Sequence, residues 1–380
     1  MIIILKRIYL NIIIFILKAI ITIYSHVHFL TFIIIMKKIL NSSLQQLGFG
    51  LVFGALLMTS CSEDPVQDTL KVPDAKDFTI ALKAPSTDPI IIEDLGSNTF
   101  KTTQAPGVDR GRFNITLSYL LPPTDRQVEV FEAAAARWER IIIKDEPSFT
   151  GSLPSAFEGF PALVDEGTVD DIIIEVALAS IDGPGGILGQ AGPQFVRTDD
   201  FLTLSGVMFF DVADLDFLES LNLFEEVIVH EMGHVLGVGT LWNVAPFGFD
   251  RTLRGGSDDN PYFLGRKANV FWNAEGGTEE LPIEGDFGPG TRFGHWDEAA
   301  LNNELMTGFL NLGENPLSRI TAGSMRDLGY GSSSVGESYD LPKGTPGVAA
   351  KGLASDEGLH IGAMEELLQP VGFVNMKKKK

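Results

Sequence analysis

The sequence predicts an α+β fold, in which a twisted mixed sheet is backed by two helices. The first observation behind this prediction is the order of segments: a strand-like segment, an amphipathic helix-like segment and several further strand-like segments precede a second, strongly apolar helix. The second observation is size, because 380 residues with 44% hydrophobic content can bury a large core in one large or two modest domains.

Periodicity indicates the first elements of this fold. Residues 113–120, FNITLSYL, alternate apolar and polar positions, which predicts a strand. Thr124 and Gln127 form a capping-box pattern, and apolar residues then recur at spacings of three and four. They predict an amphipathic helix packed on the sheet. Further strands are predicted at 169–181 and 202–211.

Residues 183–193, GPGGILGQAGP, predict a glycine-rich turn followed by a short extended segment. We expect ILGQAGP to form the edge of the sheet beside a cleft, where main-chain groups can hold an extended peptide. A plain surface hairpin explains the pattern nearly as well. Earlier in the chain, residues 61–109 are polar and proline-bearing and indicate a tether, to which the apolar run at 90–92 adds one strand.

The amino-terminal region indicates export. Residues 36–60 resemble a bacterial secretory signal, with Lys37 and Lys38 ahead of an apolar stretch. Cys61, the only cysteine, follows two small residues as in a lipoprotein signal, where cleavage leaves an acylated cysteine. An ordinary secretory signal with a leftover cysteine is the alternative. Residues 1–35 form a second apolar block, which is either a membrane anchor or, as we favour, lies upstream of a true start at Met36.

These features predict a lipoprotein that is exported to the bacterial outer membrane and held there by its N-terminal lipid. The acidic start at 62–64 resembles a tag for the cell surface, although such short acidic runs more often belong to a solvated linker. The first 60 residues hold five basic and no acidic residues, so the remainder carries 24 basic against 50 acidic residues and a formal charge of −26. This charge argues against a nucleic-acid partner. A single cysteine excludes an internal disulfide.

Residues 227–242, VIVHEMGHVLGVGTLW, contain His230, Glu231 and His234 in the HExxH arrangement. In a helix, residues four apart lie on the same face, so both imidazoles can bind one metal ion. Glu231 then lies beside the metal and can act as a general base on water. The motif therefore predicts a zinc hydrolase with two of its ligands assigned.

The bounds of this helix are predicted from its ends. Asn222 can cap the N-terminus, with Glu225 at the third helical position. Gly237 can take the left-handed conformation that ends a helix. Apolar residues on both sides of the helix predict that it is central and buried.

A third ligand must come from farther along the chain, because catalytic zinc takes three protein ligands. Thr240 stands where the pattern HExxHxxGxxH would place a third histidine. Beyond the signal region, the histidines that remain are His295 and His360. His295 lies in the stretch DFGPGTRFGHWDEAALNNELMTG at 286–308, which also contains Met306.

This stretch, GTLW after the helix, and NPLSRITAGSMRDLGY at 315–330 resemble leishmanolysin-type metallopeptidases. These are metzincins in which an insertion separates HExxHxxG from the third histidine. The resemblance covers residues 110–330, with the insertion at 241–294. It implies a metzincin-like sheet with two helices and a mostly irregular C-terminal subdomain that carries the third ligand and a methionine turn.

The resemblance also implies the role of each site residue. His230, His234 and His295 would bind Zn²⁺, Glu231 would be the general base, and Met306 would form the methionine turn beneath the metal. The protein would then be a secreted metalloendopeptidase that acts on protein or peptide substrates. Leishmanolysins themselves are rich in disulfides and lipid-anchored at the carboxyl end, whereas this chain has one cysteine and a predicted anchor at its amino end.

Two alternatives remain open. A thermolysin-like site would take its third ligand from Glu298 or Glu304, but this leaves His295 and Met306 unexplained. A non-catalytic, metal-stabilised surface lipoprotein that binds a polymer or a host protein is the second alternative, and the intact Glu231 argues against it.

The remaining segments give weaker signals. Acidic residues in the insertion could bind Ca²⁺, although no calcium loop is present and a solvated face is favoured: Asp258, Asp259, Glu279, Glu280, Glu284 and Asp286. Residues 331–380 indicate a poorly ordered tail with one short helix around 362–368, and His360 is expected to be a solvated surface residue.

Overall fold

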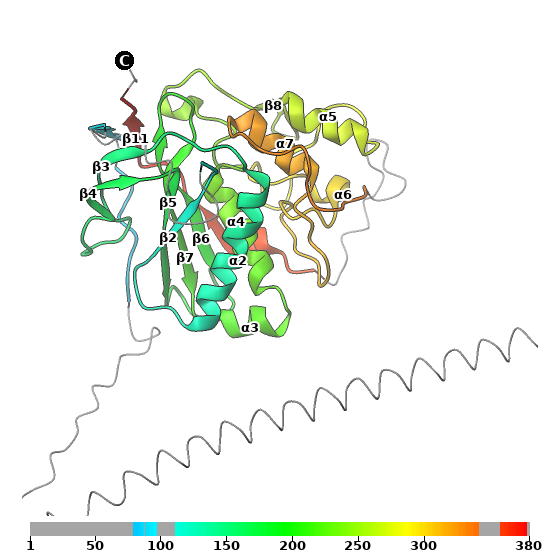
Figure 1. Cartoon of the computed structure of the whole chain (residues 1–380). Helices are drawn as coiled ribbons and strands as arrows, with labels where there is room; N and C mark the ends of the chain where they lie inside the picture. Colours follow the sequence, from blue (N-terminus) through cyan, green and yellow to red (C-terminus); the bar gives the residue numbers. More distant parts are fainter. Residues whose placement is uncertain (1–78, 87, 97–110, 342–357, 378–380) are drawn as a thin grey trace, which may run out of the picture. The chain divides into compact units, whose positions relative to one another are not determined.

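The computed structural model of the chain describes residues 79–86, 88–96, 111–341 and 358–377 (Figure 1). The predicted signal at 36–60, Cys61 and the apolar block at 1–35 lie outside the described residues. Within the described ranges, no helix combines the length and the apolar character needed to cross a membrane.

A seven-stranded sheet forms the centre of the described fold. It is mixed, as the sequence predicts. Its strands follow the order β1-β11-β6-β7-β5-β2, and the short β10 also pairs with β6. Strands β2, β5 and β7 run parallel, β6 runs antiparallel to β7, and β1, β10 and β11 follow the direction of β6. The bounds are β1 Ile90–Glu93, β2 Ile115–Tyr119, β5 Ile172–Ala179, β6 Gly189–Arg197, β7 Thr203–Asp211, β10 Glu365–Leu367 and β11 Gly372–Asn375.

Both faces of the sheet are covered, which explains the continuous apolar run of β5. Ile172 and Ile174 point into the main core, whereas Ile173, between them, packs into a smaller cluster on the opposite face. Every residue of β5 and β7 is buried. The opposite face is covered in part by a separate hairpin of β3 (Phe149–Leu153) and β4 (Val164–Val169).

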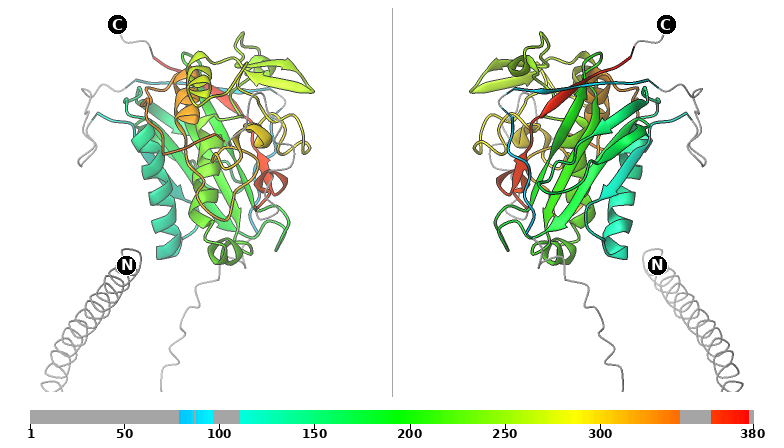
Figure 2. Two further views of the ribbon diagram at one scale, coloured as in Figure 1. Left: turned by 90° about the vertical axis from the view of Figure 1, so that its right-hand side faces the viewer. Right: turned by 90° about the vertical axis from the view of Figure 1, so that its left-hand side faces the viewer.

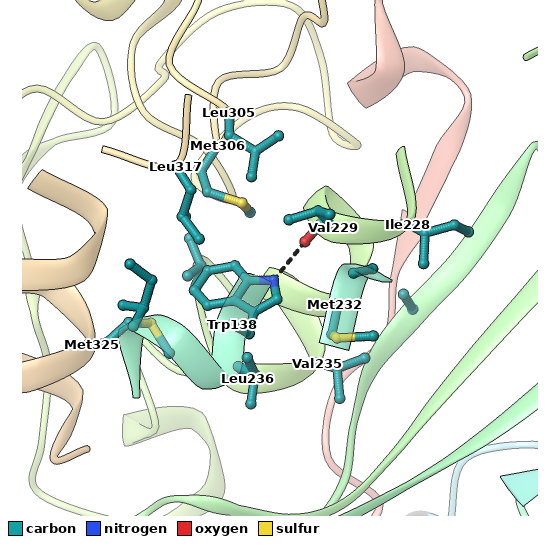
Figure 3. Close-up of a cluster of buried hydrophobic side chains, with 14 of the residues drawn as sticks. Trp138, Ile228, Val229, Met232, Val235, Leu236, Leu305, Met306, Leu317 and Met325 are labelled. Carbon is teal, nitrogen blue, oxygen red and sulfur yellow. Dashed lines mark hydrogen bonds between the residues drawn. The ribbon is translucent and has the colours of Figure 1, made fainter. Parts of the chain in front are cut away.

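Two helices, α2 (Asp125–Ile141) and α4 (Phe224–Leu236), pack together on one face of the sheet (Figures 1 and 2). The predicted capping box of α2 is confirmed: Gln127 N–H donates to Thr124 Oγ1, and Thr124 N–H donates to the Gln127 side chain. Trp138 of α2 is fully buried and donates a 2.8 Å hydrogen bond to the carbonyl of Val229 in α4 (Figure 3). This contact fixes the two helices against each other.

The prediction that Asn222 caps the N-terminus of α4 is wrong. Asn222 has a φ of 58°, which is incompatible with the extended N-cap conformation, and no side chain caps the helix. Asn222 instead ends the preceding helix α3 (Leu215–Ser220): its N–H donates to Glu219 O at 3.0 Å, and Leu223 N–H donates to Leu218 O at 2.9 Å. These two bonds form a Schellman motif, for which a left-handed asparagine is well suited.

The predicted insertion at 241–294 contains a short 3₁₀ helix, a hairpin and a helix. The long stretch that follows it is mostly irregular, as expected, and helix α5 packs on α7 at the end of this region. The elements are η2 Ala245–Phe247, β8 Arg254–Ser257, β9 Asn260–Phe263, α5 Arg266–Ala274, α6 Glu298–Leu301 and α7 Arg319–Leu328.

The prediction of a poorly ordered tail from residue 331 is wrong for residues 358–377. This segment forms the 3₁₀ helix η3 (Ile361–Ala363), β10 and β11, and both strands join the central sheet. Phe373 and Val374 are 1% and 0% exposed, so the apolar run of β11 contributes to the core. The sheet therefore extends beyond the predicted domain bounds of 110–330 at both ends of the chain.

Candidate metal centre

The structure brings together the three predicted histidine ligands. His230 and His234 lie on consecutive turns of α4, and His295 reaches them from the irregular segment before α6. Their Nε2 atoms form a triangle with sides of 3.0 Å (His230–His234), 3.1 Å (His234–His295) and 3.2 Å (His230–His295). All three side chains are fully buried.

Each of these imidazoles is held by a backbone carbonyl at its other nitrogen. His230 Nδ1 lies 2.7 Å from Leu305 O, His234 Nδ1 lies 2.9 Å from Val238 O, and His295 Nδ1 lies 2.8 Å from Thr291 O. Because a carbonyl can only accept, each Nδ1 carries the proton. The three Nε2 lone pairs therefore face one another, and a shared cation satisfies all of them.

A fourth residue, Glu365 of β10, completes this group. Its Oε1 lies 2.8 Å from His295 Nε2, and its Oε2 lies 3.3 Å from His230 Nε2 and 3.9 Å from His234 Nε2. The Glu365 side chain is 0% exposed. His230, His234, His295 and Glu365 thus form a buried group that could hold a metal ion. Sequence reasoning missed Glu365, because no motif spacing links a glutamate in the predicted tail to the HExxH helix.

Glu231 lies beside this group and is fully buried. Neither of its carboxylate oxygens has a hydrogen-bond donor among the described residues. Burial and the neighbouring Glu365 carboxylate raise the pKa of Glu231 well above its usual range. Burial alone would also raise the pKa of Glu365, but the imidazoles of His295 and His230 lower it well below its usual range. The ionised form of Glu365 is therefore stabilised at this site, whereas the ionised form of Glu231 is destabilised.

Gly237 ends α4 as predicted, with a φ of 111°. The turn that follows directs the Val238 carbonyl back towards His234, and Thr240 Oγ1 donates a 2.6 Å hydrogen bond to His234 O. Thr240 occupies the position at which the pattern HExxHxxGxxH has its third histidine. Its hydrogen bond stabilises the C-terminal end of α4.

Gly239 in the same turn allows His295 to approach His230 and His234. Its φ is 74°, and a Cβ atom at this position would lie 2.1 Å from the carbonyl oxygen of Gly294. Gly294 immediately precedes His295 in the chain. The two glycines let the His295 segment pack directly on the turn after α4.

A β-turn at Glu304–Thr307 supports His230. Thr307 N–H donates to Glu304 O at 3.1 Å, and the turn presents the Leu305 carbonyl to His230 Nδ1. Glu304 holds the turn from within, because its carboxylate accepts hydrogen bonds from Met306 N–H and from the Ser318 side chain, both at 2.7 Å.

Met306, in this turn, is fully buried next to α4 (Figure 3). A Cβ atom on Gly233 would lie 2.7 Å from the Met306 sulfur and 2.8 Å from Trp138. Glycine at position 233, between the two helical histidines, therefore makes room for the methionine. The structure thus places Met306 next to the helix that carries His230 and His234.

The glutamates considered as alternative third ligands serve other purposes. Glu304 bonds within its turn, and Glu298 is buried in α6 apart from the histidine group. Of the acidic residues considered for calcium, Glu284 is 1% exposed, which corrects the expectation of a solvated face at that position. Its carboxylate accepts from Asp286 N–H at 2.8 Å and from Glu298 N–H at 3.1 Å.

Two further predictions are corrected near the site. His360 is not a solvated surface residue: its ring stacks on Phe309 at 4.1 Å, and its Nε2 lies 3.1 Å from Thr291 Oγ1. The segment ILGQAGP contributes to β6, but β10 covers the edge expected to be open, with Glu365 opposite Gly189.

Comparison with models of known protein families and with curated proteins found no match for this chain.

Proposed function

We propose that this protein is a zinc-dependent metalloendopeptidase of the leishmanolysin-like metzincin type. The observation that carries the proposal is the triangle of three Nε2 atoms beside the buried, unpartnered carboxylate of Glu231. Each histidine is fixed at Nδ1 by a carbonyl, which leaves every Nε2 free to bind metal. The order of motifs along the chain supports the family assignment.

The geometry of the histidines favours zinc. A tetrahedral ion with Zn–N bonds of about 2.0–2.1 Å separates its ligand atoms by about 3.3 Å. The Nε2 separations of 3.0–3.2 Å agree with this spacing. Three neutral imidazoles are also the ligand set of known catalytic zinc sites.

The residues around the site can then perform peptide hydrolysis. Zinc bound by His230, His234 and His295 supplies Lewis-acid polarisation of a carbonyl and activation of water. Glu231 accepts the proton of the attacking water and passes it to the leaving amine. With β10 displaced, the outer edge of β6 at residues 189–191 could hold an extended peptide through its main chain. A Cβ on Gly189 would lie 3.7 Å from Glu231 Oε1, so this part of β6 runs beside the base.

The proposed location follows from the sequence alone. The signal at 36–60 and Cys61 support an exported lipoprotein of the bacterial outer membrane. Protein or peptide substrates follow from the proposed peptidase activity.

The test compares two matched substitutions on α4. Glu231→Gln removes the base, whereas Glu225→Gln changes a glutamate in the first turn of α4 that lies outside the metal group. Both are made in the full chain and in a Glu365→Gln background. Casein hydrolysis should fall by about 10²–10⁴-fold in Glu231→Gln and remain unchanged in Glu225→Gln, with one zinc per chain in both. Equal rates for Glu231→Gln and its parent would show that Glu231 is not the base.

Glu365 favours a second candidate function, because structural zinc sites take four protein ligands. In this case the protein would be a non-catalytic surface lipoprotein stabilised by metal. A protein that binds zinc, unfolds on chelation and cleaves neither casein nor a peptide library, with or without Glu365, would support this second function.

A further inference from the structure

The segment 358–377 returns to the metal centre from the far end of the described chain. It reaches the site along β6: β10 pairs with β6 in parallel register, with Glu365 opposite Gly189 and Leu367 opposite Ala191. Leu188 N–H donates to Met364 O at 2.7 Å, and Leu368 N–H donates to Ala191 O at 2.8 Å. The main-chain groups at this end of the outer edge of β6, which a bound peptide would use, are therefore already engaged by the chain itself.

The side chain of Glu365 points from β10 towards His230, His234 and His295. Its two oxygens lie 2.8 Å from His295 Nε2 and 3.3 Å from His230 Nε2. Three histidines leave one position of a tetrahedral zinc open for water or substrate, and a carboxylate is a good zinc ligand. The carboxylate of Glu365 is the group that faces this position in the structure.

Glycines elsewhere in the fold lie in close contact with this segment. A Cβ on Gly192 would lie 2.2 Å from Leu368 O, and one on Gly290 would lie 2.4 Å from Gly362 O. On Gly294, next to His295, a Cβ would lie 2.3 Å from the Leu367 side chain. Three glycines thus provide the space for close approach of the segment.

The two strands of the segment differ in how firmly they are held. β11 lies between β1 and β6, and its residues Phe373 and Val374 are buried in the core. β10 has only three residues and, within the described part of the chain, pairs with β6 alone. β11 is therefore the anchor of the segment, and β10 is the part that can move.

We infer that β10 is a built-in inhibitory strand, in which Glu365 supplies a fourth metal ligand while its backbone blocks the edge of β6 that a substrate would bind. This inference rests on the proposed function. In the closed form, neither water nor a peptide carbonyl can reach the metal. Displacement of β10, with β11 still in the sheet, opens the site.

The experiment measures access to the metal independently of catalysis. The full chain, Glu365→Gln and Glu365→Ala are loaded with Co²⁺, whose visible absorption reports its ligands, and titrated with acetohydroxamate as a small metal-binding probe. Glu366→Gln is the matched control, because Glu366 is the exposed neighbour on the same strand and bonds to the Gln190 side chain. Near-ultraviolet circular dichroism and metal content verify that each variant is folded and loaded.

Loss of Glu365 should change the cobalt spectrum and tighten acetohydroxamate binding by about tenfold or more, whereas Glu366→Gln should match the parent. In the unaltered chain, saturating acetohydroxamate should increase amide exchange of 364–368 and leave β11 protected. Unchanged spectra and probe affinity in both Glu365 variants would overturn the inference. The inference would also be overturned if the amide exchange rates of β10 in the unaltered chain did not change when acetohydroxamate is bound.

Casein hydrolysis then separates this inference from the proposed function. If the Glu365 variants bind the probe and cleave casein faster than the parent, both proposals are supported. If they bind the probe more tightly but cleave nothing, the inhibitory closure of the metal stands and the peptidase assignment fails.

Discussion

Gly239→Ala should damage the metal centre from a position that touches no metal ligand side chain. Position 239 has a φ of 74°, and its new Cβ would lie 2.1 Å from Gly294 O and 2.6 Å from Gly294 Cα. Ordinary contacts between such atoms are about 3.5 Å, so the backbone that carries His295 must shift by about 1 Å. A zinc ligand tolerates a displacement of only about 0.2 Å.

The loss of stability can be divided into two contributions. A left-handed alanine costs about 1 kcal/mol, and the forced separation of two packed backbones adds about 1–3 kcal/mol. Gly248→Ala isolates the first contribution, because Gly248 has a φ of 89° but no atom within 4 Å of its would-be Cβ. We therefore expect a loss of about 2–4 kcal/mol for Gly239→Ala and of about 1 kcal/mol for Gly248→Ala.

Urea unfolding of the two metal-free variants measures these losses, and competition with a chromophoric chelator measures zinc affinity. Zinc affinity should fall by at least about tenfold in Gly239→Ala and stay at the parental value in Gly248→Ala. If both variants lose the same stability and both bind zinc like the parent, the packing of Gly239 on Gly294 does not position His295.

Two further predictions concern buried carboxyl groups near the site. Burial raises the pKa of Glu298 from 4.5 to about 8, so the folded protein holds a proton that the unfolded chain releases, and this contribution to stability falls as pH rises from 4.5 to about 8. Glu298→Gln should therefore show a smaller loss of stability between about pH 5 and about pH 8 in urea unfolding than the parent, and equal pH slopes would argue against this. Glu304→Gln should lower the free energy of unfolding by about 2–4 kcal/mol and weaken zinc binding, because an amide group would face the Ser318 and Met306 donors. The exposed Glu314→Gln serves as its control in the same assays, and equal stability of the two variants would contradict the role of Glu304 in the turn.

Features with local causes could be predicted from the sequence. The capping box at Thr124 depends on residues three positions apart, and the shared face of His230 and His234 depends on helical spacing. The ending of α4 at Gly237 depends on the left-handed backbone that glycine readily adopts. Alternating and continuous apolar runs indicated β2, β5 and β7 in the same way.

Features that depend on distant partners could not be predicted. Asparagine suits both an N-cap and a left-handed position, and the bond from Leu223 N–H to Leu218 O decides that Asn222 ends α3. Glu284 belongs to an acidic stretch, but its burial depends on the backbone of α6.

Glu365 is the clearest example of such a feature. Its strand has three residues, too few for a periodic pattern, and it pairs with residues 189–191. The adjacent run VGFV was a usable signal of a buried strand, because Phe373 and Val374 are among the core residues.

The position of β11 between β1 and β6 also constrains how the chain can fold during synthesis. Ile90 pairs with Gly372, so the two partners are separated by nearly the whole folded part of the chain. A ribosome must add residue 375 before β11 is complete, and until then the outer edge of β6 has no partner from this strand. Unpaired strand edges bind other strands readily. Between the synthesis of β6 and that of β11, this part of the β6 edge is therefore open to pairing with other chains.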